Sequence, residues 1–211
     1  MSSLSASSPS SAVPMRRLFG TDGVRGVANT ELSPQMALAL GAAAAIVLRE
    51  SSDSCEVVMG RDPRLSGDLL GAALVSGLCS QGMNVTVLGV LPTPGVAHVT
   101  MARKAAAGIV ISASHNPVQD NGIKFFGPDG CKLADAVEAR IEVAMTDWET
   151  HPRPSGADVG RLTRTTEPIE SYRAHLKKAA GPEGLSGLRL VVDCANGAAS
   201  FLAPELLTEL G

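Results

Sequence analysis

Hydrophobic residues between positions 33 and 114 form segments that alternate between helical and strand periodicity. Ser33 and Pro34 precede an alanine-rich apolar segment, and this pair is typical of a helix N-terminus. A second apolar-periodic segment closes at Gly82, and glycine commonly ends helices. The pattern predicts, in order, a helix over 34–50, a strand over 55–60, a helix over 68–82, a strand over 84–90, a short helix from 91–95 to about 104, and a strand over 106–114.

Short strands that alternate with helical crossovers predict an α/β fold. We expect a mixed, mainly parallel sheet sandwiched by helices, since crossover helices cover both faces of such a sheet. Ligands bind outside the carboxyl ends of the strands in this architecture. Three loops, 61–67, 91–95 and 114–124, are therefore expected to gather at one edge of the sheet.

The second half of the chain predicts further elements: a hairpin over 122–133, a helix over 135–148, a linker over 150–160, a helix over 167–180, and a buried strand over 188–193 followed by a helix to 211. We assign residues 15–160 to one α/β domain. Residues 161–211 are assigned to a linker helix and the incomplete start of a second, similar α/β domain, because a single βα unit cannot cover both of its faces.

The first fourteen residues differ in composition from the rest. Residues 1–14 are rich in serine and carry no charged side chain, which predicts a disordered tail. The segment lacks the basic and apolar regions of a secretory signal. Met15 follows directly and is a candidate for the true start of the protein.

Composition excludes several classes of function. The net charge is -3 and aromatic residues make up 3% of the chain, which disfavours nucleic-acid binding. The longest apolar run, 36–48, is shorter than the roughly 20 residues that a membrane-spanning helix needs, so no membrane partner is expected. Four cysteines without a Cys-x-x-Cys pair are typical of reduced, packed thiols in a cytoplasmic protein.

Polar residues follow the predicted strand 106–114 at the expected ligand edge. Ser114 is a candidate nucleophile, with His115 and Asn116 beside it. Side chains of neighbours on an extended backbone point apart, so His115 is expected to be a poor partner for Ser114, and acyl transfer is disfavoured. Phosphoryl transfer requires mainly cations and N–H groups around the nucleophile. On composition alone, a simple turn over these residues is the favoured interpretation.

Cationic side chains occur near this loop in three further segments. Arg25 lies in a glycine-rich segment, 19–27, which suits either a phosphate site or a tight turn. Arg61 and Arg64 precede a predicted helix and suit either an anion or an internal pair with Asp62. Lys124 lies in an apolar segment, where it fits a phosphate clamp, a proton exchanger or an outward-facing strand residue.

Taken together, these segments are more specific than any one of them. The chain resembles the α-D-phosphohexomutase superfamily over about residues 17–211, and within it the branch that acts on glucosamine phosphates. The motifs that carry this resemblance are LFGTDGVRG, GRDPRLSG, ISASHNPVQDNGIKFF and DGCKLAD.

The resemblance implies a mechanism. Ser114 is implied to be a phosphoserine that gives its phosphoryl group to glucosamine 6-phosphate and forms glucosamine 1,6-bisphosphate as an intermediate. The bisphosphate then returns its other phosphate to Ser114 and leaves glucosamine 1-phosphate, a precursor of UDP-N-acetylglucosamine. Arg25 and Lys124 are implied to lie near the transferring group, with Lys124 exchanging a proton with the sugar hydroxyl, and His115 and Asn116 to line the site.

The resemblance also implies Mg²⁺, held by the Ser114 phosphate and three aspartates of an Asp-Gly-Asp-Gly-Asp loop. No such loop occurs up to Gly211, so the chain alone is expected to be an inactive fragment. A phosphomannomutase or phosphoglucomutase, a non-catalytic sugar-phosphate-binding protein and, least favoured, a hydrolase stay open as alternatives. A homodimer of the full-length enzyme also stays open.

Overall fold

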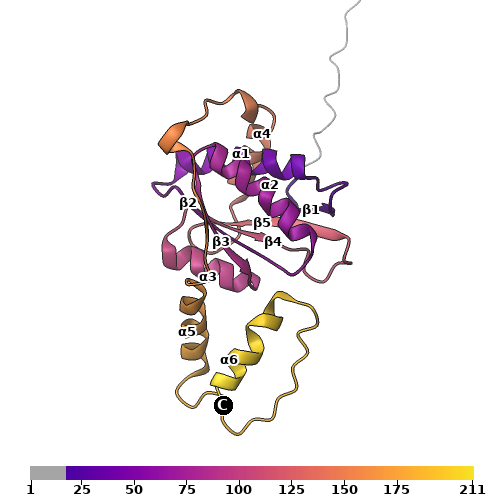
Figure 1. The fold of residues 1–211 in the computed structure, drawn as a ribbon, viewed down its shortest axis with the longest axis vertical. Helices are drawn as coiled ribbons and strands as arrows, with labels where there is room; N and C mark the ends of the chain where they lie inside the picture. The colour runs from indigo at the N-terminus through magenta and orange to yellow at the C-terminus, as the bar shows by residue number, and fades with distance from the viewer. Residues whose placement is uncertain (1–17) are drawn as a thin grey trace, which may run out of the picture.

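The computed structural model describes residues 18–211, so the expectations for residues 1–14 and for Met15 lie outside the described part. Its centre is a six-stranded sheet with the order β1-β5-β4-β2-β3-β6 (Figure 1). The strands are β1 Val24–Val27, β2 Glu56–Arg61, β3 Asn84–Val90, β4 Ala107–Ile111, β5 Asp120–Phe126 and β6 Leu162–Arg164.

The sheet is mixed and has its parallel part in the middle. β2 pairs in parallel with β3 and β4, and β6 pairs in parallel with β3. β5 runs antiparallel to both β4 and β1. β4 and β5 therefore form an antiparallel hairpin, and the loop 112–119 that joins them leaves the sheet at the carboxyl end of β4.

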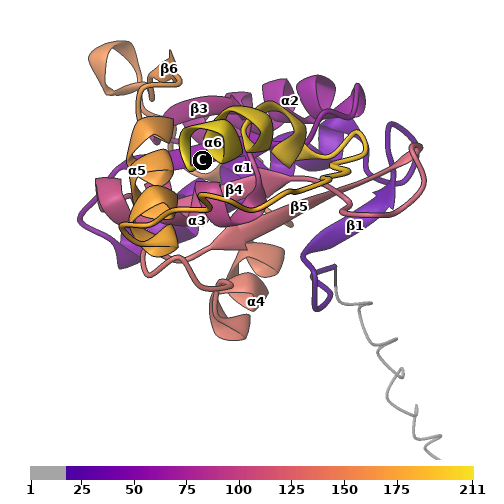
Figure 2. The ribbon, with the colours of Figure 1, turned by 90° about the horizontal axis from the view of Figure 1, so that it is seen from below.

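Helices cover both faces of the sheet, as expected. The α-helices are α1 Pro34–Ser51, α2 Ser66–Ser80, α3 Thr93–Arg103, α4 Asp135–Ala144, α5 Ile169–Ala180 and α6 Ala203–Glu209. Figure 1 shows α1 and α2 above the sheet and α3 and α5 below it, and α3, α5 and α6 lie on the near side in Figure 2. Ser33 caps α1 as predicted, because its hydroxyl accepts a hydrogen bond from the Met36 N–H at 3.2 Å.

Two hydrophobic cores stabilise the layers. The larger core joins α1, α2 and α4 to one sheet face and buries Leu40, Leu74 and Ile109 completely. The smaller core joins α3 and α5 to the other face around Val58 and Tyr172. Both cores support β4, so the strand that leads into loop 112–119 is buried along its whole length.

Two strands were not predicted. β1 lies in the glycine-rich segment that was interpreted as a phosphate site or a turn. A tight turn does form, with reciprocal hydrogen bonds between Gly20 and Gly23, but the chain then pairs with β5. Gly23 has a φ of 84°, and a Cβ there would lie 2.3 Å from the Ile123 carbonyl oxygen. The strand β6 likewise exists only because Val85 and Val87 of β3 pair with it.

Two other predictions are corrected. The hairpin predicted over 122–133 is reduced to β5, a turn closed by the Gly127 N–H and the Cys131 carbonyl, and one isolated bridge. The segment 188–193 is not a buried strand. No other described segment pairs with it, and Val191 is fully exposed, so its apolar pattern has neither backbone partners nor a core to cover.

The cysteines are also less buried than expected. Cys55 and Cys131 are exposed, whereas Cys79 is partly buried against the larger core. Burial raises the pKa of the Cys79 thiol, because desolvation disfavours the thiolate. Within residues 18–211, no helix has the length and apolar character needed to cross a bilayer.

Candidate active site

The loop 112–119 presents Ser114 at the end of the β4–β5 hairpin. Ser114 is exposed and adopts a φ of 58°, a left-handed conformation that costs a residue with a Cβ about 1–2 kcal/mol. Its N–H donates to the Ser112 hydroxyl at 3.0 Å. The sharp turn is closed by the Asn116 N–H, which donates to the Ala113 carbonyl. The hydroxyl of Ser114 is therefore presented by an ordered, strained turn.

His115 is closer to Ser114 than predicted. The Ser114 Oγ lies 3.3 Å from the His115 Nδ1, which corrects the expectation that the two side chains point apart. The reason is the backbone, which is left-handed at Ser114 and not extended. The imidazole can therefore share a proton with the hydroxyl oxygen.

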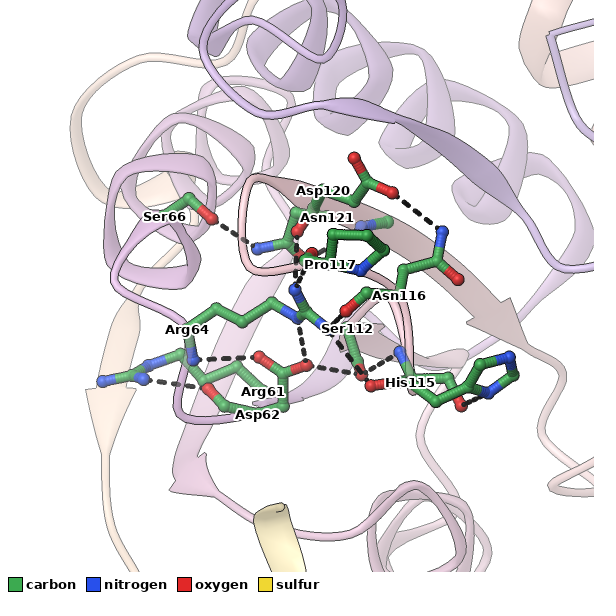
Figure 3. A network of polar contacts seen from close by, with 12 residues as sticks. Arg61, Asp62, Arg64, Ser66, Ser112, His115, Asn116, Pro117, Asp120 and Asn121 are labelled. Carbon is green, nitrogen blue, oxygen red and sulfur yellow. Dashed lines mark hydrogen bonds and ion pairs between the residues drawn. The ribbon is translucent and has the colours of Figure 1, made fainter. Parts of the chain in front are cut away.

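Arg64 connects the loop after β2 to the loop that carries Ser114 (Figure 3). Its guanidinium forms an ion pair with Asp62 at 3.0 Å, and both side chains are only 11% exposed. The remaining guanidinium N–H groups point into the curve of loop 112–119. They donate to the carbonyl oxygens of Ser114 at 3.1 Å, Asn116 at 2.8 Å, Pro117 at 2.6 Å and Asp120 at 3.1 Å.

A second polar chain joins Asn116 to Lys124. The Arg25 Nη1 donates to Asn116 Oδ1 at 3.4 Å, and its other terminal nitrogen lies 3.4 Å from Asp22 Oδ2. The other carboxylate oxygen of Asp22 pairs with Lys124 Nζ at 3.2 Å. The register of β1 places Arg25 opposite Gly122 and so brings it to Asn116 of the serine loop, and Asp22 links Arg25 to Lys124. Lys124 itself lines a separate cavity of about 180 Å³ together with Asp22.

The pKa of the Asp22 carboxyl provides a test of this polar chain. A hydrogen bond from Lys124, and then the charges of Lys124 and Arg25, hold its pKa below the usual 3.8. A lowered folded-state pKa means that the ion pair favours the folded state above pH 3.8, and that this contribution is lost as the pH falls through the folded-state value. We expect Lys124→Met to raise the Asp22 pKa towards 3.8, measured by NMR of the side-chain carboxyl. The remote Lys178→Met is the control, and an unchanged Asp22 pKa in Lys124→Met would contradict the assigned pairing.

An open cavity lies against the serine loop. It has a volume of about 670 Å³ and is lined by residues of 62–65, 112–118 and 194–198. This volume is within the range of about 300–1,000 Å³ for small-molecule sites. Ser114, His115, Asn116 and Arg64 all lie on its wall. Arg61 does not, because its side chain turns to Asp68 of α2 at 2.9 Å and lines a different cavity of about 470 Å³.

Two residues of this site were not predicted, Asp22 and Ser112, whereas the predicted internal pair of Asp62 with Arg64 does form. The Asp62 carboxylate accepts from the Ser112 hydroxyl at 2.7 Å, and the residue is buried. Asp22 had a signal in the sequence, since it lies three residues before Arg25 in the same glycine-rich segment. Ser112 had a weaker one, because a serine two residues before Ser114 shares its side of a strand.

The described residues do not by themselves fit a Mg²⁺ ion. Among residues 18–211, no three acidic, histidine or cysteine side chains cluster as metal ligands. The carboxylates nearest Ser114 are engaged, since Asp62 binds Arg64 and Ser112, and Asp120 accepts from Asn116 at 2.9 Å. Mg²⁺ prefers six oxygen ligands in near-octahedral geometry, which a single phosphoserine does not supply.

The comparisons with known proteins agree with this geometry. Residues 16–151 match the family model described as phosphoglucomutase/phosphomannomutase, alpha/beta/alpha domain I. A solved phosphoglucomutase/phosphomannomutase family protein from Burkholderia thailandensis is similar in fold, with a TM-score of 0.79 at 28% identity. The similarity covers 93% of this chain and 43% of that one.

Curated relatives are more similar in sequence. The phosphoglucosamine mutase of Desulforamulus reducens is 55% identical over 198 residues, and that of Symbiobacterium thermophilum is 56% identical over 200 residues. Each match covers 93% of this chain and 44% of the relative, so the chain spans less than half the length of these proteins. With its serine loop, its mixed sheet and these matches, the chain belongs to the phosphoglucomutase/phosphomannomutase family and carries its domain I.

Proposed function

We propose that the protein is a phosphoglucosamine mutase, which interconverts glucosamine 6-phosphate and glucosamine 1-phosphate through a phosphorylated Ser114. The observation that carries the proposal is the exposed Ser114 on an ordered turn, next to a chain of polar contacts that contains two cations. Arg25 donates to Asn116 of this turn, and Asp22 connects Arg25 to Lys124. The identity of about 55% to curated phosphoglucosamine mutases supports this substrate over mannose or glucose phosphates.

The proposed reaction has two transfers. In the first, the C1 hydroxyl oxygen of glucosamine 6-phosphate attacks the phosphorus on Ser114, the bond to Ser114 Oγ breaks, and the 1,6-bisphosphate forms. The sugar hydroxyl loses its proton and Ser114 Oγ gains one. After the bisphosphate turns around, Ser114 Oγ attacks the phosphorus on O6 and releases glucosamine 1-phosphate. The phosphoryl group and the proton are both returned, so the net reaction is an isomerisation.

We assign a role to each side chain of the site. Lys124 exchanges the proton with the sugar hydroxyl, and Arg25 supplies positive charge for the phosphoryl oxygens. His115 Nδ1, at 3.3 Å from Ser114 Oγ, shares the proton that this oxygen gains and loses. Phosphoryl transfer depends mainly on such positioning and charge, so a weakly activated serine suffices as the nucleophile.

Mg²⁺ enters the proposal only as a charge partner of the Ser114 phosphate. Residues 18–211 supply no carboxylate cluster to complete its coordination, and no step above depends on it. The chemistry that the ion would supply is neutralisation of charge on the transferring phosphoryl group.

The ratio of kcat/KM values tests the substrate. For the full-length protein, we expect kcat/KM for glucosamine 6-phosphate to exceed that for mannose 6-phosphate and glucose 6-phosphate by at least about tenfold. One polar contact to the amino group of the sugar is enough for a preference of this size. A preference for mannose 6-phosphate or glucose 6-phosphate would replace the proposal with the phosphomannomutase or phosphoglucomutase alternative. Binding of all three sugars without turnover would favour a non-catalytic sugar-phosphate-binding protein.

A further inference from the structure

Arg64 has no donor left for a ligand. A guanidinium has five N–H donors, and those of Arg64 make one contact with Asp62 and four contacts with carbonyl oxygens of the serine loop. The side chain is 11% exposed, so although Arg64 lines the cavity, its N–H groups are directed at the loop and not at the open space. Figure 3 shows the guanidinium in the curve of the loop, surrounded by its acceptors.

Asp62 connects this guanidinium to Ser114 from the other direction. Its carboxylate accepts the Arg64 side chain and the Arg64 backbone N–H, each at 3.0 Å, and the Ser112 hydroxyl at 2.7 Å. The Ser112 oxygen in turn accepts the Ser114 N–H. The amide and the carbonyl of Ser114 are therefore both held by one connected network, on the two sides of a residue with a left-handed backbone.

We propose that Arg64 is a positioning residue of the mutase reaction. It fixes the conformation of loop 112–119 in which Ser114 receives and gives up a phosphoryl group, and it does not itself bind the sugar phosphate. The inference rests on the proposed function for its catalytic part. The sequence left two alternatives open for Arg64, the environment of the substrate phosphate or an internal pair with Asp62, and the contacts fit the internal pair.

The loop needs such a group because four of its backbone carbonyl oxygens are directed at the same guanidinium. Without the guanidinium, these dipoles would repel one another and lose the donor that they share. An eight-residue hairpin loop would then adopt other conformations, and Ser114 would leave its left-handed geometry. Lysine cannot replace the guanidinium fully, because an ammonium has three N–H donors and no planar fork.

The test combines kinetics and amide hydrogen exchange on Arg64→Ala and Arg64→Lys in the full-length protein. We expect kcat for glucosamine 6-phosphate to fall about 100-fold in Arg64→Ala, because misplacement by about 1 Å costs this much, with KM within about threefold of the unmutated value. Arg64→Lys should be intermediate. Exchange protection should fall in 112–121 and stay unchanged in β2 and β3.

Arg103→Ala is the matched control. Arg103 also pairs with a carboxylate, Glu56, at 2.8 Å, but at the opposite end of β2 from the serine loop. We expect its kcat, KM and loop exchange to equal those of the unmutated protein.

Three results would overturn the inference: unchanged exchange in 112–121, a looser loop with unchanged kcat, or a raised KM with unchanged kcat, as expected of a phosphate ligand. Arg64→Lys keeps the test decisive if Arg64→Ala fails to fold. If the unmutated protein turns over no hexosamine phosphate, the proposed function fails together with the catalytic part of this inference. Hydrogen exchange then still decides whether Arg64 orders the loop.

Discussion

Ser114→Ala is expected to abolish mutase turnover in the full-length protein, with kcat reduced by more than about 10,000-fold, since no other group can carry the phosphoryl between the two transfers. The loss should leave the fold intact, because Ser114 is exposed and the only hydrogen bond of its hydroxyl within residues 18–211 is with the adjacent His115. Steady-state kinetics and intact mass together measure the effect. The variant should also lack the added mass of one phosphoryl group.

Ser76→Ala is the control for this prediction. Ser76 is an exposed serine on α2 that donates to the Ala72 carbonyl, and it lies outside the cavity beside Ser114. We expect unchanged turnover for this variant. Measurable turnover by Ser114→Ala, with the same substrate and after removal of wild-type protein, would contradict the assignment of Ser114 as the phosphoryl carrier.

Lys124→Met is expected to reduce kcat by about 100- to 10,000-fold, the range of a lost general acid–base group. Methionine keeps an unbranched, apolar stem between Ile123 and Phe125, so the strand should persist while the amino group is lost. Steady-state kinetics on the full-length protein measure the effect.

Lys124→Arg separates proton exchange from charge. A guanidinium keeps the positive charge but stays protonated, so it cannot accept a proton from the sugar hydroxyl. We expect Lys124→Arg to be as slow as Lys124→Met. Recovery of the rate in Lys124→Arg would show that Lys124 acts by its charge alone. The control is Lys178→Met, on the exposed face of α5, which should leave kcat unchanged.

The central part of the fold could be predicted from the sequence because its elements are buried. β3 was predicted with its observed bounds, and α3 and β4 to within a few residues, since dense apolar segments bounded by turns leave few alternatives. β1 was missed because its short, glycine-rich segment becomes a strand only through its pairing with β5. The strand predicted over 188–193 failed for the opposite reason, because the apolar pattern was present and the pairing strand was not.

The candidate site was predictable in its residues but not in their roles. A strand that ends in polar side chains located Ser114 and its neighbours at the ligand edge of the sheet. The role of Arg64 depends on carbonyl oxygens 50 to 56 positions away in the chain, and these have no signature in the side-chain sequence. The contact of His115 with Ser114 depends on one backbone angle, which serine rarely adopts.

The most direct test of the account is to locate the phosphoryl group on the protein. The full-length protein would first be dephosphorylated with a phosphatase, then incubated with glucosamine 1,6-bisphosphate that carries labelled phosphoryl groups, digested, and mapped by mass spectrometry. The account predicts a label on Ser114 and on no other residue of the chain. An unlabelled protein, or a label on Ser112 in place of Ser114, would contradict it.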